Sequence, residues 1–330
     1  MEAVVKKLIL ALLLMVLFLI KYPLATLESV NKVSDYPAME MDFYGSNALL
    51  PQNAAQVHKL IERFYPKAAQ KPADINCSLI GVHNPSSGSI YGRNFDWYHT
   101  LPIIFRVHRM PGRYASISMV DGSYLSVTGS LSLMDRIKMM GGYISPFDGM
   151  NEKGLFIAIA MINKGKVLTD PKKETLTSVQ MVRKILDMAA TLDEALNICN
   201  SYNIDFFPGP HLHFLIADAN GKGSVVEFSP EGVKVYRKDN LIFATNFVMA
   251  PGTPEDFVGK CWRFDKINAT LPGEGNAPFT ENNMMNLLEN VKQTLNKGGT
   301  EWSAVYESTG NLTVCFGKDY SQPYHFKLGK

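Results

Sequence analysis

The segment Gly154–Ile162 most constrains the fold of this chain, because it is apolar along its whole length (Gly-Leu-Phe-Ile-Ala-Ile-Ala-Met-Ile). Successive side chains of a strand point to opposite faces of a sheet. A strand that is apolar on both sides must therefore lie in a sheet that is covered on both faces.

Strand-like runs and helix-like segments alternate around this strand. Runs rich in β-branched and aromatic residues are Ser78–His83, Ser89–Asn94, Ile103–Arg109, Tyr114–Val120, His213–Asp218, Ser224–Ser229, Val233–Arg237 and Leu241–Thr245. Helical periodicity is found at Thr177–Ala190, Leu192–Cys199, Asp256–Ile267 and Glu281–Leu295, and two further strands end the chain. This order predicts an α+β fold in which two sheets stack face to face with helices outside them.

The N-terminus carries a second apolar run, from Leu8 to Ile20, directly after Lys6 and Lys7. Its length matches the core of a secretory signal peptide and is short for a membrane span of about 20 residues. Residues 21–25 offer only a poor cleavage site, since Pro23 stands where a small residue is preferred. Residues 1–25 are thus either a cleaved signal peptide or a retained anchor at residues 8–20, and the remainder is expected to be secreted or extracytoplasmic.

Composition excludes several other classes of protein. The net charge of +2 gives no electrostatic basis for binding nucleic acid. His211 and His213 share a strand face, but no carboxylate or cysteine lies close to them in sequence. We therefore expect neither a metal nor a cofactor. The four cysteines have no zinc-type spacing: Cys77, Cys199, Cys261 and Cys315.

Residues 26–76 form a region of different character from the strands that follow. Residues 26–52 show no periodicity and are expected to be irregular. Apolar positions at helical spacing predict one helix over Asn53–Ala68, with Asn53 as its cap. A short polar stretch then leads to Asn76 and Cys77.

Cys77 opens the first strand of a predicted hairpin. Taken alone, a cysteine is more often a small buried apolar residue than a nucleophile. The returning strand of the hairpin, however, brings Arg93 and Asp96 close to the start of the first one. These two residues either pair with each other across the hairpin end, or hold an amine and tune a thiolate.

Five ordered blocks of the sequence resemble the choloylglycine hydrolase group of N-terminal nucleophile hydrolases, whose relatives include penicillin V acylases and acid ceramidase-like enzymes. The resemblance covers residues 77 to about 325. The blocks are Cys77-Ser78 with Gly92–Trp97, then Asp148–Leu155, His213–Ala219 with Val225–Phe228, Ala244–Phe247, and Arg263.

The resemblance implies a four-layer αββα sandwich and a catalytic domain, residues 77–330, that begins at Cys77. In such enzymes the freed α-amine of the nucleophile is its own general base. An α-amine titrates near pH 8, whereas a backbone amide has no comparable basicity. Cleavage between Asn76 and Cys77, with the thiol of Cys77 attacking the preceding carbonyl, is therefore expected to activate the enzyme.

The resemblance also assigns catalytic roles to residues. Cys77 would form a thioester with the substrate, Asp96 would orient its amine, and Arg93 would support the thiolate. Asn246 would donate to the oxyanion through its side-chain amide, although it could instead end its strand as a turn residue. Arg263 would support the region of the nucleophile, with a surface ion pair to an acidic neighbour as the competing interpretation.

The substrate-binding position departs from the relatives. Bile-salt-cleaving relatives carry Asn, and penicillin-cleaving relatives Tyr, seven residues after the glycine that corresponds to Gly154. Here that residue is Met161, and Asn163 follows two positions later on the same strand face. A bulge or shifted register would bring Asn163 into the oxyanion role; otherwise that contact is missing.

These observations predict an autoproteolytically activated hydrolase of carbon–nitrogen bonds in linear amides. Its substrate would be a small-molecule N-acyl amide with a fatty or aromatic acyl group. Two alternatives are an acyltransferase that uses the same thioester and a membrane-tethered binding protein without activity. The apolar face of the predicted Asn53–Ala68 helix needs a partner, which favours retention of residues 26–76 as a small subunit over their loss as a propeptide.

Overall fold

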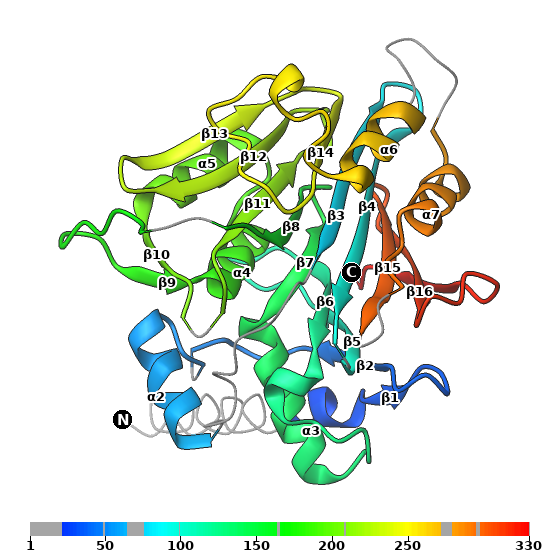
Figure 1. Cartoon of the computed structure of the whole chain (residues 1–330). Helices are drawn as coiled ribbons and strands as arrows, with labels where there is room; N and C mark the ends of the chain where they lie inside the picture. The colour runs from blue at the N-terminus through cyan, green and yellow to red at the C-terminus, as the bar shows by residue number, and fades with distance from the viewer. Residues whose placement is uncertain are drawn as a thin grey trace, which may run out of the picture.

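The structure is a computed structural model that describes residues 22–48, 50–64, 76–98, 100–163, 166–207, 209–271, 279–294 and 298–329. Two β-sheets stack face to face, and helices cover their outer faces (Figure 1). The apolar run Leu8–Ile20, the core of the predicted signal peptide or anchor, lies outside these residues. Within them, no helix combines the length and the apolar character needed to cross a membrane.

The larger sheet has nine strands in the order β1-β2-β5-β6-β7-β8-β11-β12-β13. All neighbouring pairs are antiparallel except β2 and β5, which are parallel. The bounds are β1 Asn31–Lys32, β2 Met39–Phe43, β5 Pro102–Val107, β6 Ser116–Asp121, β7 Pro146–Asn151, β8 Phe156–Met161, β11 Leu212–Ala217, β12 Gly223–Ser229 and β13 Gly232–Arg237.

The smaller sheet has six antiparallel strands in the order β14-β3-β4-β15-β16-β17. A separate parallel pair joins β9 and β10. The bounds are β3 Cys77–Asn84, β4 Gly88–Trp97, β9 Thr175–Thr177, β10 Asn203–Asp205, β14 Leu241–Ala244, β15 Gly299–Glu307, β16 Asn311–Phe316 and β17 Tyr324–Lys327.

Helices α4 and α5 pack on the larger sheet, whereas α6 and α7 pack on the smaller one (Figure 1). Thr177 caps α4 and Thr191 caps α5, and both caps satisfy backbone N–H groups that a helix start leaves unpaired. The helices are α2 Ala54–Phe64, α3 Leu133–Met139, α4 Ser178–Met188, α5 Leu192–Ser201, α6 Trp262–Thr270 and α7 Glu281–Asn290, with short 3₁₀ helices η1 Gly122–Leu125, η2 Met140–Ile144 and η3 Pro254–Asp256.

Strand β8 is covered on both faces, as its sequence predicts. Phe156 and Ala158 are fully buried in the core between the two sheets. Ile157 and Ile159 belong instead to the core between the larger sheet and helices α4 and α5. The layers therefore follow the order helices, sheet, sheet, helices, and the predicted four-layer αββα sandwich is confirmed.

The prediction that residues 26–52 are irregular is wrong. β2 pairs in parallel with β5 and thereby extends the larger sheet. Its sequence, Met-Glu-Met-Asp-Phe, alternates apolar and acidic residues, and its burial alternates in the same way. This is the period of a half-buried strand, and five residues are too short a run to stand out among the prolines around it.

Two other predicted elements change their bounds. The helix predicted at Asp256–Ile267 is a short 3₁₀ helix followed by α6, which begins only at Trp262. Gly259 lies between them with a positive φ of 79°, a backbone conformation that ends a helix. The end of the chain forms three strands rather than two.

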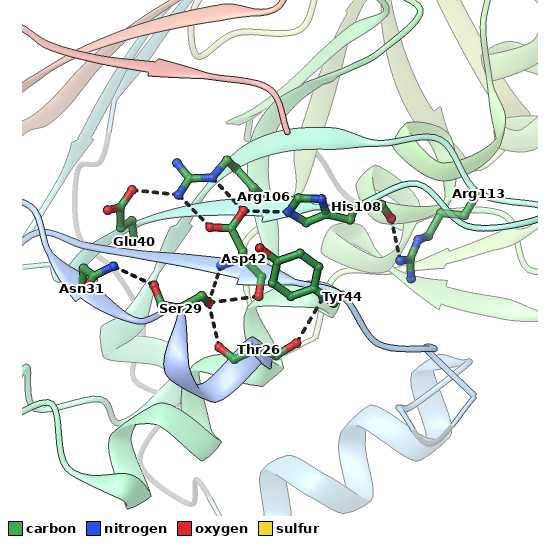
Figure 2. A network of polar contacts seen from close by, with 9 residues as sticks. All are labelled: Thr26, Ser29, Asn31, Glu40, Asp42, Tyr44, Arg106, His108 and Arg113. Atoms are coloured by element: carbon green, nitrogen blue, oxygen red, sulfur yellow. Dashed lines mark hydrogen bonds and ion pairs between the residues drawn. The ribbon is translucent and has the colours of Figure 1, made fainter. Parts of the chain in front are cut away.

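The N-terminal segment is fastened to the larger sheet by a polar network, which Figure 2 shows. Asp42 on β2 accepts hydrogen bonds from Arg106 at 2.8 and 2.9 Å and lies 2.8 Å from the ring of His108. Glu40 accepts a further bond from Arg106 at 2.9 Å. Burial alone would raise the pKa of Asp42, but the bonds to His108 and Arg106 outweigh it and lower the pKa to about 2.

We predict that replacing Asp42 by Asn lowers the free energy of unfolding by about 1–2 kcal/mol at neutral pH. A carboxyl whose pKa is lowered by folding stabilises the fold above its unfolded pKa, and this stabilisation is lost as the pH falls through its folded pKa. The difference between wild type and variant should therefore shrink between about pH 4 and about pH 2. Urea unfolding across this range measures it.

The control is Asp35→Asn, which removes the fully exposed partner of Lys32. Pairs of this kind contribute little to stability, so this variant should unfold like the wild type at every pH. A difference between wild type and Asp42→Asn that does not change with pH would contradict the assignment.

Candidate active site

Cys77 is the first residue of β3 and pairs with Phe95 of β4, while Leu79 pairs with Arg93. Residues opposite each other in an antiparallel pair point to the same face, so the side chains of Cys77 and Arg93 lie together. Nη2 of Arg93 approaches Sγ of Cys77 to 3.7 Å. Burial raises the pKa of the Cys77 thiol, and the Arg93 guanidinium opposes that shift because it favours the thiolate.

Arg93 is a fully buried cation with several partners. Its Nη1 lies 2.9 Å from Oδ2 of Asp148 and donates to the carbonyl of Phe147 at 2.6 Å. The hydroxyl of Tyr306 donates to the other oxygen of Asp148. The guanidinium also lies over the ring of Phe95, 4.9 Å from its centroid. These contacts hold the charge beside the sulfur and exclude the pairing of Arg93 with Asp96 across the hairpin end.

Asn246 follows β14 and contacts the backbone of Cys77. Its Oδ1 accepts from the backbone nitrogen of Cys77 at 2.6 Å and from Nη2 of Arg263 at 3.0 Å. Its Nδ2 donates to the carbonyl of Met161 at 2.8 Å. Arginine has only donors and a carbonyl only accepts, so these neighbours fix the orientation of the amide. One of the two Nδ2 hydrogens bonds to Met161, which leaves the second for another acceptor.

Arg263 reaches the same point from α6. Its Nη1 donates to the carbonyl oxygen of Cys77 and to Oγ of Ser78, the latter at 3.1 Å. Its side chain is buried, which excludes the competing interpretation as a surface ion pair. The nitrogen, the carbonyl oxygen and the sulfur of Cys77 are therefore each contacted by a different side chain.

Asp96 lies near the end of β4 and is buried. Thr300 of β15 donates to its Oδ1 at 2.6 Å, whereas its Oδ2 has no hydrogen-bond partner among the residues that the structure describes. Burial raises the pKa of Asp96 to about 7, although Arg263 and Thr300 oppose this shift. In the intact chain, the nitrogen of Cys77 bonds to Asn246, so the predicted bond between Asp96 and a freed amine stays a prediction.

An apolar cavity, partly open to solvent, begins at Cys77 and Arg93. Phe206 and Phe207, in the loop between β10 and β11, line it. Met161, the last residue of β8, also lines it. Other apolar lining residues include Phe95, Trp97, Tyr124, Phe147 and Leu212.

The expectation for Asn163 needs a correction. β8 pairs with β11 without a bulge up to the pair Met161 and Leu212, so no register shift occurs. Asn163 lies beyond the end of this strand, its side chain is exposed, and it does not line the cavity. Asn163 therefore does not provide the hydrogen bond to the oxyanion that a shifted register would have given it.

Three residues of the site had no role assigned from sequence: Asp148, Thr300 and Tyr306. Asp148 stood in a recognisable block, but nothing in the sequence linked it to Arg93, which is 55 positions away. A buried arginine requires a buried acidic partner, and that requirement was the available signal. Thr300 and Tyr306 lie on β15, and only the pairing of β15 with β4 brings them to the site.

Residues 77–247, just over half of the chain, match the family described as linear amide C-N hydrolases, choloylglycine hydrolase family. The chain belongs to this family. The family resemblance seen in the sequence is thus confirmed. The predicted enzyme class, a hydrolase acting on carbon–nitrogen bonds of linear amides, is confirmed as well. No curated protein sequence shows significant similarity to the chain.

Three solved structures that match the chain are distant from it in sequence. A mutant of conjugated bile acid hydrolase from Clostridium perfringens is 16% identical, with 76% of this chain and 92% of that chain covered and a TM-score of 0.49. Penicillin V acylase from Agrobacterium tumefaciens is 15% identical, with 76% and 86% covered and a TM-score of 0.48. The N-acylethanolamine-hydrolyzing acid amidase ortholog of Caenorhabditis elegans is 16% identical, with 71% and 93% covered and a TM-score of 0.45.

We predict that Asp148→Asn lowers the free energy of unfolding by about 3–5 kcal/mol, because it leaves the buried Arg93 charge without its counterion. Tyr306→Phe removes one hydrogen bond to the same carboxylate and should cost about 1–3 kcal/mol. Urea unfolding followed by tryptophan fluorescence measures both, on a Cys77→Ala background that cannot be cleaved. Equal losses in the two variants would show that the charge pair does not stabilise the site.

Proposed function

We propose that the chain is a cysteine amidohydrolase that activates itself by cleavage between Asn76 and Cys77 and hydrolyses an N-acyl amide through a thioester on Cys77. The observation that carries this proposal is the surroundings of Cys77. Its backbone nitrogen lies 2.6 Å from Oδ1 of Asn246, and the residue itself lines the apolar cavity. A nucleophile whose own amine is the base requires this arrangement.

Activation begins at the carbonyl carbon of Asn76. Sγ of Cys77 attacks this carbon, the bond from it to the Cys77 nitrogen breaks, and the nitrogen takes up the thiol proton. The result is a thioester between residues 76 and 77 and a free α-amine. Water then hydrolyses the thioester to leave a carboxylate on Asn76 and the thiol of Cys77. Asn246 and Arg263 support these steps because they hold the Cys77 backbone.

The same atoms serve the catalytic cycle. The α-amine takes the thiol proton, and the thiolate attacks the carbonyl carbon of the substrate amide. The oxyanion that forms on the carbonyl oxygen accepts a hydrogen bond from the second N–H of the Asn246 side-chain amide. The leaving amine takes its proton from the α-ammonium, and water deprotonated by the α-amine hydrolyses the acyl thioester. Asp96 accepts a hydrogen bond from the α-ammonium, and the Arg93 charge favours the thiolate.

The cavity favours an apolar acyl group. Aromatic and aliphatic side chains form most of its lining, and Arg93 is the only charged side chain among the lining residues that the structure describes. Burial of each methylene of a fatty acyl chain would contribute about 0.8 kcal/mol to binding, and an aromatic acyl group would gain from burial of its ring in the same way. We infer a substrate with such an acyl group on one side of the amide.

Residues 26–76 are proposed to remain bound after cleavage as a small subunit. β2 is hydrogen-bonded into the larger sheet, and Phe43 packs against Phe105 and Tyr143 in its core. Tyr36 donates to Glu301 at 2.6 Å, which ties the segment to β15 as well. Cleavage of one peptide bond breaks none of these contacts.

The apolar run Leu8–Ile20 precedes this segment. Because of this run, we propose that the enzyme is secreted or extracytoplasmic, whether or not the run stays as an anchor.

We predict that purified wild-type protein contains two polypeptides that co-elute in gel filtration, the larger of which begins at Cys77. Cys77→Ala should remain one uncleaved and inactive chain, because it lacks the attacking sulfur. Cys261→Ala is the matched control and should be cleaved like the wild type. Intact-mass measurement and N-terminal sequencing decide between these results. An active wild-type enzyme of full length would overturn the amine-as-base mechanism.

We predict that Asn246→Ala lowers kcat by about 10²–10³, since loss of one oxyanion donor has this effect in other enzymes. Asn163→Ala removes the exposed asparagine outside the cavity and should leave kcat within error of the wild type. Steady-state hydrolysis of a fatty N-acyl amide by fully cleaved protein provides the measurement. Equal effects of the two substitutions would contradict the assignment of Asn246.

A further inference from the structure

One wall of the acyl cavity comes from the part of the chain that lies before the cleavage site. Val57 and Leu60 of α2 line the same cavity as Cys77. Their spacing of three residues places them on one face of the helix. Val57 is buried and Leu60 is partly exposed, as expected for side chains that border an open cavity.

Polar contacts fasten the start of α2 to the elements that form the adjacent wall. Oδ1 of Asn53 accepts from the nitrogen of Gln56 at 3.1 Å and caps the helix. Nδ2 of Asn53 donates to Glu174 at 3.1 Å, just before β9. Gln180 of α4 donates to the carbonyl of Pro51 at 3.1 Å. Residues at the start of α4, Ser178 and Val179, also line the cavity.

A second set of contacts joins α2 to the loop on the other side. His58 lies 3.2 Å from Oδ2 of Asp205. Its ring meets the ring of Phe207 edge to face, with centroids 4.9 Å apart. Phe206 and Phe207 both line the cavity. Helix α2 is therefore fixed between two walls of the cavity, and its position determines the space that remains between them.

We propose that Val57 and Leu60 of α2 determine which acyl chain lengths the enzyme accepts. This inference rests on the proposed function and adds to it a role for the severed segment. A longer apolar side chain at position 60 takes space from the acyl group, whereas a shorter one adds space. The N-terminal segment is thus a specificity-determining part of the mature enzyme and not an inhibitor that must leave.

The test uses fully cleaved wild type, Leu60→Phe and Leu60→Ala with a series of N-acyl amides that share one amine and differ in the length of a saturated acyl chain. Relative to wild type, Leu60→Phe should shift the optimum of kcat/KM to shorter chains, and Leu60→Ala should shift it to longer ones. Each methylene that is newly excluded or newly buried should change kcat/KM about fourfold. Lys59→Ala, an exposed neighbour on the same helix, should keep the wild-type profile.

A profile that keeps its optimum in both Leu60 variants, even with kcat/KM lowered uniformly, would overturn the inference and leave the proposed function intact. Uniform loss is what a purely structural helix would give. A cleaved wild type that hydrolyses no member of the series would overturn the proposed function itself, and the inference with it. N-terminal sequencing and a thermal melt of each variant show that both polypeptides are folded and present.

Discussion

The buried charge of Arg93 is the constraint on which the active site depends. Removal of an isolated cation from water costs several kcal/mol, and only close partners offset this cost. Asp148, the carbonyl of Phe147 and the ring of Phe95 supply them, from strands of both sheets. The stacking of the two sheets therefore creates the environment that keeps a positive charge 3.7 Å from Sγ of Cys77. A looser sandwich would admit water, and the charge would lose its influence on the sulfur.

Around this charge, three side chains from separate elements contact three atoms of one residue. Arg93 from β4 contacts the sulfur of Cys77, Arg263 from α6 its carbonyl oxygen, and Asn246 its nitrogen. The proposed cleavage before Cys77 would give its nitrogen additional hydrogens and basicity, whereas the contacts of Arg93 and Arg263 to the sulfur and the carbonyl oxygen could stay as they are. Burial raises the pKa of Asp96 to about 7, and the ammonium that the proposed cleavage creates would favour the ionised form of this carboxyl.

Sequence patterns predicted the order of helix and sheet layers well. The spacing of apolar residues along the chain, and the length of uninterrupted apolar runs, indicate directly which faces of an element are buried. The run at Gly154–Ile162 required two covered faces, and the structure covers both. The hairpin placed Arg93 beside Cys77, since register follows from a short turn. The sequence patterns could not reveal that Asp148 neutralises Arg93, because the two residues are 55 positions apart and lie on strands of different sheets. They could not reveal the hydrogen bond from Thr300 to Asp96 either, because only the pairing of β15 with β4 joins these residues across 204 positions. Asn163 illustrates the opposite error: two residues along a strand keep the face only while the strand continues, and β8 ends at Met161.

The geometry of the N-terminal segment is that of a structural part of the fold and differs from that of a propeptide that only blocks a site. A propeptide that only blocks a site needs contacts at the mouth of the site. Here β2 is an internal strand between β1 and β5, Phe43 lies in the core, and α2 borders the cavity at Val57 and Leu60. Loss of the segment would expose the edge of β5 and the apolar surface beneath Phe43, both of which favour aggregation. Under the proposed cleavage before Cys77, the pairing of β2, the packing of Phe43 and the ion pairs of Asp42 would still hold the N-terminal segment on the larger sheet.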